Sequence, residues 1–84
     1  MAEHPNTFHL VIASVGETRF DGAAVSATFP GAAGEFTVLP RHEALVTTLK
    51  PGTITVRGTL GEPKKFEVES GVLECSGSRV VVLL

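Results

Sequence analysis

Apolar and polar residues alternate in short stretches along much of the chain. The clearest alternations are Glu35–Val38, Thr53–Arg57 and Lys65–Glu69, where every second residue is Val, Ile or Phe. A period of two places these apolar side chains on one side of an extended strand. Each stretch is therefore predicted to be an antiparallel strand with one face buried and the other in solvent.

Glycine and proline interrupt the chain so often that a helix of ordinary length has almost no place to form. The longest uninterrupted segments are Asn6–Val15 and Arg41–Lys50. The second could form a short helix, but Val46, Thr47 and Thr48 are β-branched in a row and favour a strand. We therefore expect an all-β protein with no substantial helix.

Turn residues separate the predicted strands at short intervals. Pro51 and Gly52 suit the central positions of a type II turn, which is expected to join residues 44–50 to residues 53–57. About eight to ten short strands at this spacing predict a β-sandwich or barrel. The other predicted connections are two hairpin loops, residues 58–63 and 76–78, and a kink or bulge at Ser70–Gly71.

Two segments depart from simple alternation. Phe8–Val15 and Arg79–Leu84 are apolar on both faces of a strand. Such strands lie in the centre of a sheet, or carry an outer face that something else covers. No obvious covering element is present in the sequence, so a partner protein is a candidate for that role.

The composition is that of one ordinary globular domain, with 84 residues, 43% of them hydrophobic and 19% charged. We expect a single domain over residues 1–84, with residues 1–7 loosely ordered. The seven Lys and Arg residues are scattered and the formal net charge is −2. Because no basic stripe is available to follow phosphates, nucleic acid is not expected as a ligand.

The sequence also limits where the protein works. Its longest apolar runs are far too short to span a bilayer, so membrane association is expected only through a partner. The N-terminal residues lack the basic region and apolar run of a secretory signal, and the single Cys75 cannot form an internal disulfide. A reducing compartment is therefore favoured.

Catalytic and metal-binding chemistry find little support. His4, His9 and His42 have no close paired spacing of the kind that zinc sites use. Cys75 shares a predicted strand face with Leu73 and is interpreted as a small core thiol. The acidic pair Glu67 with Glu69 is interpreted as part of a solvated strand face, and the pair Glu35 with Glu43 flanks a turn. Neither is expected to form a glycosidase-type carboxylate pair, and no glycine-rich phosphate loop precedes a helix. No catalytic residue, metal or cofactor is expected, and an interaction module is favoured.

Residues Gly34–Ile54, "GEFTVLPRHEALVTTLKPGTI", resemble the signature of the epsilon subunit of F-type ATP synthases. That family has Gly-Glu, an aliphatic pair, Pro-x-His, aliphatic residues with Thr, and Lys-Pro-Gly in this order. Three further segments match in register: Phe8–Ser14 the first strand, Arg19–Gly22 a Phe-x-Gly turn, and Ser70–Leu83 a Gly-aliphatic-Leu-Glu segment with the closing strand. The resemblance covers residues 8–84.

The resemblance implies a ten-stranded antiparallel β-sandwich, or flattened barrel. In that family the domain belongs to the rotor stalk, packs against the gamma subunit, rests on the membrane ring of c subunits and holds no catalytic residue. It implies a position at the cytoplasmic face of a bacterial inner membrane, with membrane contact only through the c-ring and no obligate homo-oligomer.

Residue by residue, the resemblance assigns two groups to these contacts. Glu35 matches the acid of the Gly-Glu loop and His42 the histidine after the proline, at the end that approaches the c-ring and the foot of gamma. The loop group expected to face the c-ring and gamma is Glu35, Arg41, His42 and Glu43. The further candidates expected to face gamma are Ser14, Leu45, Val46 and Thr47.

The sequence departs from the family in residue type and length. Thr37 and Arg41 stand where glycine is frequent, and Glu43-Ala44 stand where Ala-Pro is frequent, so the family's detailed c-ring contacts do not carry over to these positions as an expectation. The chain stops where most epsilon subunits continue into an inhibitory helical hairpin. This end is either natural or a cut at the domain boundary, and the absence of any tag-like stretch favours a natural short form.

Two other classes of function remain as alternatives. A small β-sandwich binding a peptide or carbohydrate would need aromatic side chains at its surface, but the chain has no Trp or Tyr and only five Phe. A small hydrolase would use Cys75 or His42 as its reactive group. The rotor subunit is the preferred hypothesis.

Overall fold

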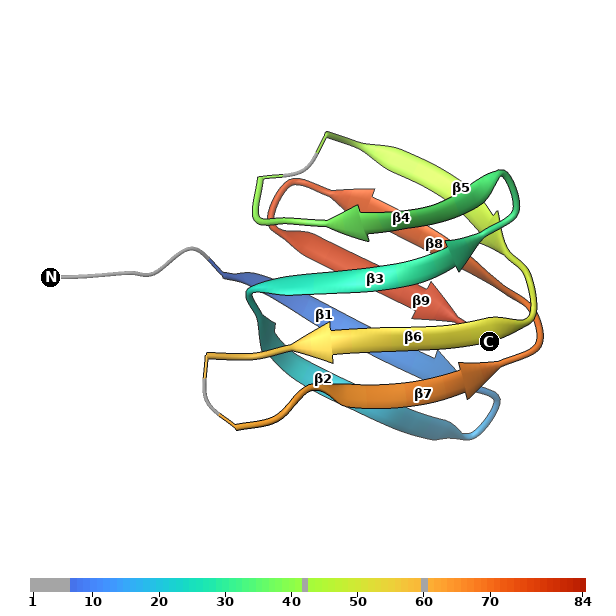
Figure 1. Ribbon diagram of the computed structural model, residues 1–84, viewed down its shortest axis with the longest axis horizontal. Helices are drawn as coiled ribbons and strands as arrows, with labels where there is room; N and C mark the ends of the chain where they lie inside the picture. The colour runs from blue at the N-terminus through green and yellow to red at the C-terminus, as the bar shows by residue number, and fades with distance from the viewer. Residues whose placement is uncertain (1–6, 42, 60) are drawn as a thin grey trace, which may run out of the picture.

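A computed structural model describes residues 7–41, 43–59 and 61–84. Within these ranges the chain forms strands and no helix (Figure 1). None of the described segments is a helix that could cross a membrane. The strands are β1 (Phe8–Ser14), β2 (Glu17–Ala24), β3 (Ser26–Gly31), β4 (Gly34–Val38), β5 (Leu45–Leu49), β6 (Gly52–Arg57), β7 (Lys64–Val68), β8 (Gly71–Ser76) and β9 (Arg79–Leu83).

The strands form two layers that face each other (Figure 1). One layer has the order β4-β3-β6-β7, and the other has the order β5-β8-β9-β1-β2. The layers are joined where β5 meets β3, because Gly31 pairs with Leu49 and the Lys50 amide donates to the Pro30 carbonyl at 2.9 Å. The molecule is thus one sheet curled into a sandwich.

The all-β prediction is confirmed, with two differences from the expected sandwich. The described residues contain nine strands, one fewer than ten. The two longest connections join β4 to β5 and β6 to β7, and their described residues form no strand. In the first connection, Pro40 has no amide hydrogen to donate and Arg41 has a positive φ of 67°. In addition, β1 pairs with β9 in parallel, whereas every other described pair is antiparallel.

The core lies between the layers and follows the alternation in the sequence. Val38, Ile54, Val56 and Val68 are buried, and their neighbours along the strands are more exposed. Phe29 is fully buried, and its ring stacks on that of Phe36 with centroids 5.6 Å apart. The other residues of the hydrophobic core are Phe8, Leu10, Ile12, Ala24, Ala27, Leu49, Leu73, Cys75, Val80 and Val82.

The predicted turn at Pro51 and Gly52 is not a hairpin. It carries the chain from β5 in one layer to β6 in the other, and these two strands do not pair. Gly52 also lacks the positive φ that a type II turn requires. Glycine is needed there for space, because a Cβ atom at Gly52 would lie 2.7 Å from the Cβ of Pro30.

Of the other three predicted connections, one differs from its prediction and two are confirmed. Ser70–Gly71 was predicted to be a kink or bulge, but it is part of a second crossing between layers: β7 pairs with β6, and β8 pairs with β5 and β9. The hairpin loops over residues 58–63 and 76–78 are confirmed, since they join the paired strands β6 and β7, and β8 and β9. The segment Leu45–Leu49 is a strand, as its β-branched residues predict.

Candidate interaction surface

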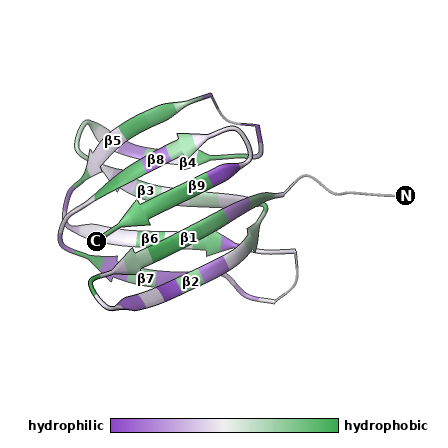
Figure 2. Cartoon of the chain, turned by 180° about the vertical axis from the view of Figure 1, so that it is seen from behind, coloured by the Kyte–Doolittle hydropathy of each residue, from purple (hydrophilic) through white to green (hydrophobic). Residues whose placement is uncertain are grey.

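The outer face of β5, β8, β9 and β1 carries two rows of side chains in register. The first row consists of Val46, Glu74, Val81 and Val11, and the second of Thr48, Val72, Leu83 and Ala13. Cross-strand neighbours lie about 4.5–5.5 Å apart, so these side chains form a continuous surface. Figure 2 shows this layer from outside, with hydrophobic colour along β9 and β1. We call these eight residues the apolar face.

The apolar face is open to solvent. Val46 is 69% exposed, Leu83 58% and Val72 44%, and Val11 and Val81 are half-buried. No segment of the described chain covers these side chains. The two segments that are apolar on both faces of the strand, noted in the sequence, become β1 and β9 at the centre of this layer.

The outer face of the opposite layer is polar. Thr28 and Thr37 join their hydroxyl groups across β3 and β4 at 2.9 Å, and Thr53 donates to Glu67 across β6 and β7 at 3.0 Å. Lys65 lies on the same side as Glu67. The sandwich therefore has one wetted face and one apolar face, which is the arrangement of a domain that uses one side for contact.

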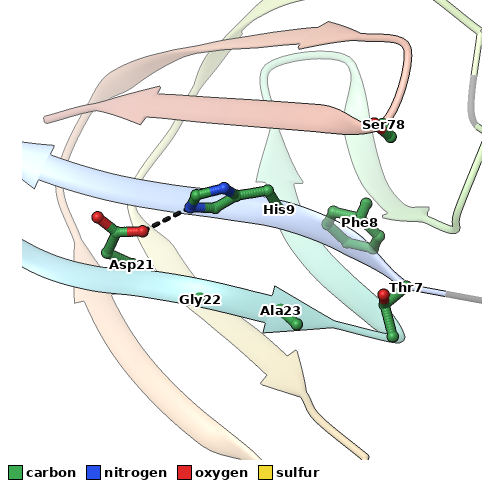
Figure 3. A pocket seen from close by; sticks show the side chains of 7 residues that line it. All are labelled: Thr7, Phe8, His9, Asp21, Gly22, Ala23 and Ser78. Atoms are coloured by element: carbon green, nitrogen blue, oxygen red, sulfur yellow. Dashed lines mark hydrogen bonds and ion pairs between the residues drawn. The ribbon is translucent and has the colours of Figure 1, made fainter. Parts of the chain in front are cut away.

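One end of the apolar face carries charge. His9 on β1 and Asp21 on β2 point toward each other, with Nε2 and Oδ1 2.5 Å apart (Figure 3). Both side chains are about half exposed, and Arg79 lies next to His9 on β9. His9 and Asp21 line an open depression of about 370 Å³, and the other lining residues are Thr7, Phe8, Gly22, Ala23 and Ser78. Within the described residues no three His, Cys, Asp or Glu side chains gather as a metal site would require.

Of the four residues expected to face gamma, only Val46 lies on the apolar face. Leu45 and Thr47 point to the other side of β5, where they line an open groove of about 380 Å³ together with Phe36 of β4. Ser14 is half-buried at the end of β1. Because β5 is at the edge of its layer, the groove and the apolar face meet along this strand.

The predicted loop group is divided between two places. Glu35 is the second residue of β4, exposed beside the groove, whereas Arg41 and Glu43 follow the end of that strand and are also exposed. At about 3.3 Å per residue, the strand alone separates Glu35 from this end by about 10 Å. His42 lies outside the described residues. The structure therefore brings Glu35 near Leu45 and Thr47 rather than into the segment that follows β4.

Cys75 lies in the core on β8 and is 2% exposed. Burial raises the pKa of its thiol above the ordinary value of 9.0, because an apolar environment disfavours the thiolate. The thiolate is the nucleophilic form of cysteine. Its location agrees with the interpretation as a core thiol and disfavours the hydrolase that uses Cys75.

Native protein is expected to resist alkylation by iodoacetamide at pH 8, while protein unfolded in urea reacts fully. Intact mass spectrometry measures both. The sign of the pH effect follows from the raised pKa: the unfolded thiol ionises first, so the free energy of unfolding falls as pH rises above about 9. Cys75→Ala should make this decline shallower than in the wild type. Rapid labelling of the native protein would contradict the buried position.

Comparison with known proteins identifies the family. A model of the β-sandwich domain of the ATP synthase delta/epsilon chain matches residues 7–84. This chain belongs to that family. The ATP synthase epsilon chain of Delftia acidovorans is 36% identical over 78 residues, which cover 93% of this chain and 56% of that protein. The epsilon chain of Bordetella bronchiseptica is 40% identical, and the match covers 92% of this chain and 55% of that protein.

Solved structures share the epsilon-type fold. A chain in the Euglena gracilis mitochondrial ATP synthase, solved with OSCP, F1 and the c-ring, aligns with a TM-score of 0.87 and 21% identity over 98% of this chain and 52% of its own. A chain of the Tetrahymena thermophila mitochondrial ATP synthase, solved as central stalk and c-ring, aligns with a TM-score of 0.76 and 11% identity. The alignment covers 89% of this chain and 60% of that chain. The present chain thus spans about half the length of the epsilon chains it matches.

Sequence reasoning missed most of the apolar face as a site. Val11, Val72, Val81 and Leu83 were not named as contact residues, although the two segments apolar on both faces indicated that an outer face was covered. The sequence does not show which strands lie next to each other in the sheet. Only the pairing of β9 with both β1 and β8 shows that these side chains form one surface.

Proposed function

We propose that this chain is the β-sandwich domain of a central-stalk epsilon subunit in an F-type ATP synthase. It binds the gamma subunit through the apolar face and meets the c-ring, so that rotation of the ring and of gamma stays coupled to ATP synthesis or hydrolysis on other subunits. The domain is non-catalytic and uses no cofactor. It works at the cytoplasmic face of a bacterial inner membrane and reaches the membrane through the c-ring.

The observation that carries this proposal is the apolar face, exposed on one side of a sandwich whose other side is polar. Burying apolar surface contributes about 25 cal/mol per Å². Surfaces buried in permanent complexes resemble a domain core cut in half. Gamma is the occupant that the resemblance to epsilon subunits implies, and a chain of similar fold occurs in a solved central stalk with a c-ring.

The edge strand β5 extends the contact. Val46 belongs to the apolar face, while Leu45 and Thr47 line the groove on the other side of the same strand. A partner that wraps around this edge touches all three residues. We therefore assign Leu45 and Thr47 to a second contact with gamma. The assignment of half-buried Ser14 to gamma rests on the sequence resemblance alone, since Ser14 follows Ala13 on β1 and adjacent side chains of a strand point to opposite sides.

The direct test is binding to gamma of the same organism. Gamma, purified with the catalytic subunits so that it is folded, is mixed with this chain at micromolar concentration and passed over a size-exclusion column. The two are expected to elute together, because covering the apolar face removes apolar surface from water and favours association. Separate elution, with no shift of either protein, would refute the proposed function.

Glu35→Lys is expected to weaken binding to the purified c-ring. The exposed carboxylate of Glu35 is assigned to basic residues of the c-ring loops. Arg41, His42 and Glu43 form the second group that is assigned to the c-ring end of the domain. An exposed ion pair contributes about 0.2–1 kcal/mol, so the dissociation constant is expected to rise about 1.4- to 5-fold. Glu67→Lys, a reversal on the polar face, is the control for net charge. Equal ring binding by both variants and the wild type would remove Glu35 from the contact.

A further inference from the structure

Glu74 lies within the apolar face. On β8 it is directly opposite Val46 on one side and Val81 on the other, and Val72 is the next outward residue of its own strand. Its side chain is exposed and makes no ion pair or hydrogen bond with another residue of the described chain. The exposed carboxylate of Glu74 is therefore hydrated, and its three neighbours on this face are valines.

A partner that covers these valines removes that water. A buried carboxylate without compensation costs several kcal/mol, whereas a carboxylate paired with a well-placed cation recovers much of this cost. The cation on the same outer face is Arg79, which is diagonal to Glu74 on β9. The structure contains no ion pair between them, and Arg79 lies in the row of His9, beside the Asp21 carboxylate.

We propose that the surface covering the apolar face presents an Arg or Lys to Glu74, surrounded by apolar side chains that pack on Val46, Val72 and Val81. Arginine fits best, because its planar guanidinium binds a carboxylate through two parallel hydrogen bonds. This inference rests on the proposed function, in which that surface belongs to gamma. Glu74 then determines specificity: apolar surfaces without the cation bind more weakly.

The sign of one substitution tests the pairing. Glu74→Gln keeps the shape and removes the charge. If gamma supplies a cation, the variant leaves that cation buried without its counter-ion, and the dissociation constant is expected to rise about 30-fold or more. If gamma supplies none, Glu74→Gln removes an unpaired buried charge and binding becomes tighter or stays the same. Either of these last results overturns the inference.

The measurement is titration calorimetry of the full chain against gamma held in its complex with the catalytic subunits. Glu67→Gln is the matched control, since Glu67 is also an exposed strand carboxylate but lies on the polar face, and its affinity should equal that of the wild type. Arg79→Gln tests whether the counter-ion of Glu74 is Arg79 of the same chain or a cation of gamma. If it weakens binding as much as Glu74→Gln does, and the double variant adds nothing, Arg79 is the counter-ion and the inference fails.

Two further outcomes distinguish the inference from the function on which it rests. Tight wild-type binding that Glu74→Gln does not weaken refutes the cation and leaves the gamma contact intact. Absence of wild-type binding refutes both. If the cation exists, Glu74→Lys should bind at least 30-fold more weakly, and replacing one Arg or Lys of gamma by Glu should restore the affinity to that variant alone. That rescue identifies the partner residue.

Discussion

Leu83→Asp is expected to weaken binding to gamma by at least 100-fold while the domain stays folded. Leu83 lies in the second row of the apolar face, opposite Val72 and Ala13. In the free protein the new carboxylate is hydrated, because the side chain at this position is 58% exposed. In the complex it would be buried among apolar groups with no cation placed for it. That cost exceeds about 3 kcal/mol, which corresponds to more than 100-fold in the dissociation constant.

Leu39→Asp is the matched control for this substitution. Leu39 is 55% exposed, but it lies after β4 and outside the apolar face. Its variant should bind gamma with wild-type affinity, as measured by titration calorimetry. Circular dichroism and the thermal midpoint of both variants report whether the fold is retained. A folded Leu83→Asp protein that still binds gamma as tightly as the wild type would show that gamma docks elsewhere.

The sequence predicted local structure well because strand and turn preferences are local properties. Alternation of apolar and polar residues placed Val38, Ile54 and Val68 correctly in the core. It could not show how the strands are connected in space. The crossing from β5 to β6 carries the same Pro-Gly signal as a hairpin turn, and the difference lies in the approach of Gly52 to Pro30, which are distant in sequence.

The candidate site was less accessible from the sequence for the same reason. Val46 was named as a contact residue, but its two neighbours in sequence were placed with it, although side chains of adjacent strand residues point to opposite sides. Leu45 and Thr47 accordingly line the groove. Glu74 was noted in the sequence only as the acid of the Gly-aliphatic-Leu-Glu segment, without a contact role, since an exposed glutamate becomes unusual only when its neighbours on β5 and β9 are known to be valines.

Phe29→Ala is expected to lower the free energy of unfolding by about 3–5 kcal/mol. Phe29 is fully buried at the centre of β3, and its ring stacks on Phe36, so the substitution removes an aromatic contact and leaves a cavity. A chain of 84 residues has a total stability of about 4–13 kcal/mol. Urea denaturation followed by circular dichroism should give a much lower midpoint than the wild type. A change below 1 kcal/mol would mean that the core repacks around the gap.

The same variant links stability to binding. Phe29 lies inside the sandwich and not on the apolar face, so folded Phe29→Ala protein should still bind gamma. A partner that binds only the folded state stabilises it, by about 2.7 kcal/mol when its free concentration is 100 times the dissociation constant. Excess gamma should therefore slow proteolysis of Phe29→Ala markedly, as followed on gels. The double variant Phe29→Ala/Leu83→Asp should gain no such protection, because its apolar face can no longer hold gamma. Equal protection of both variants would contradict docking at this face.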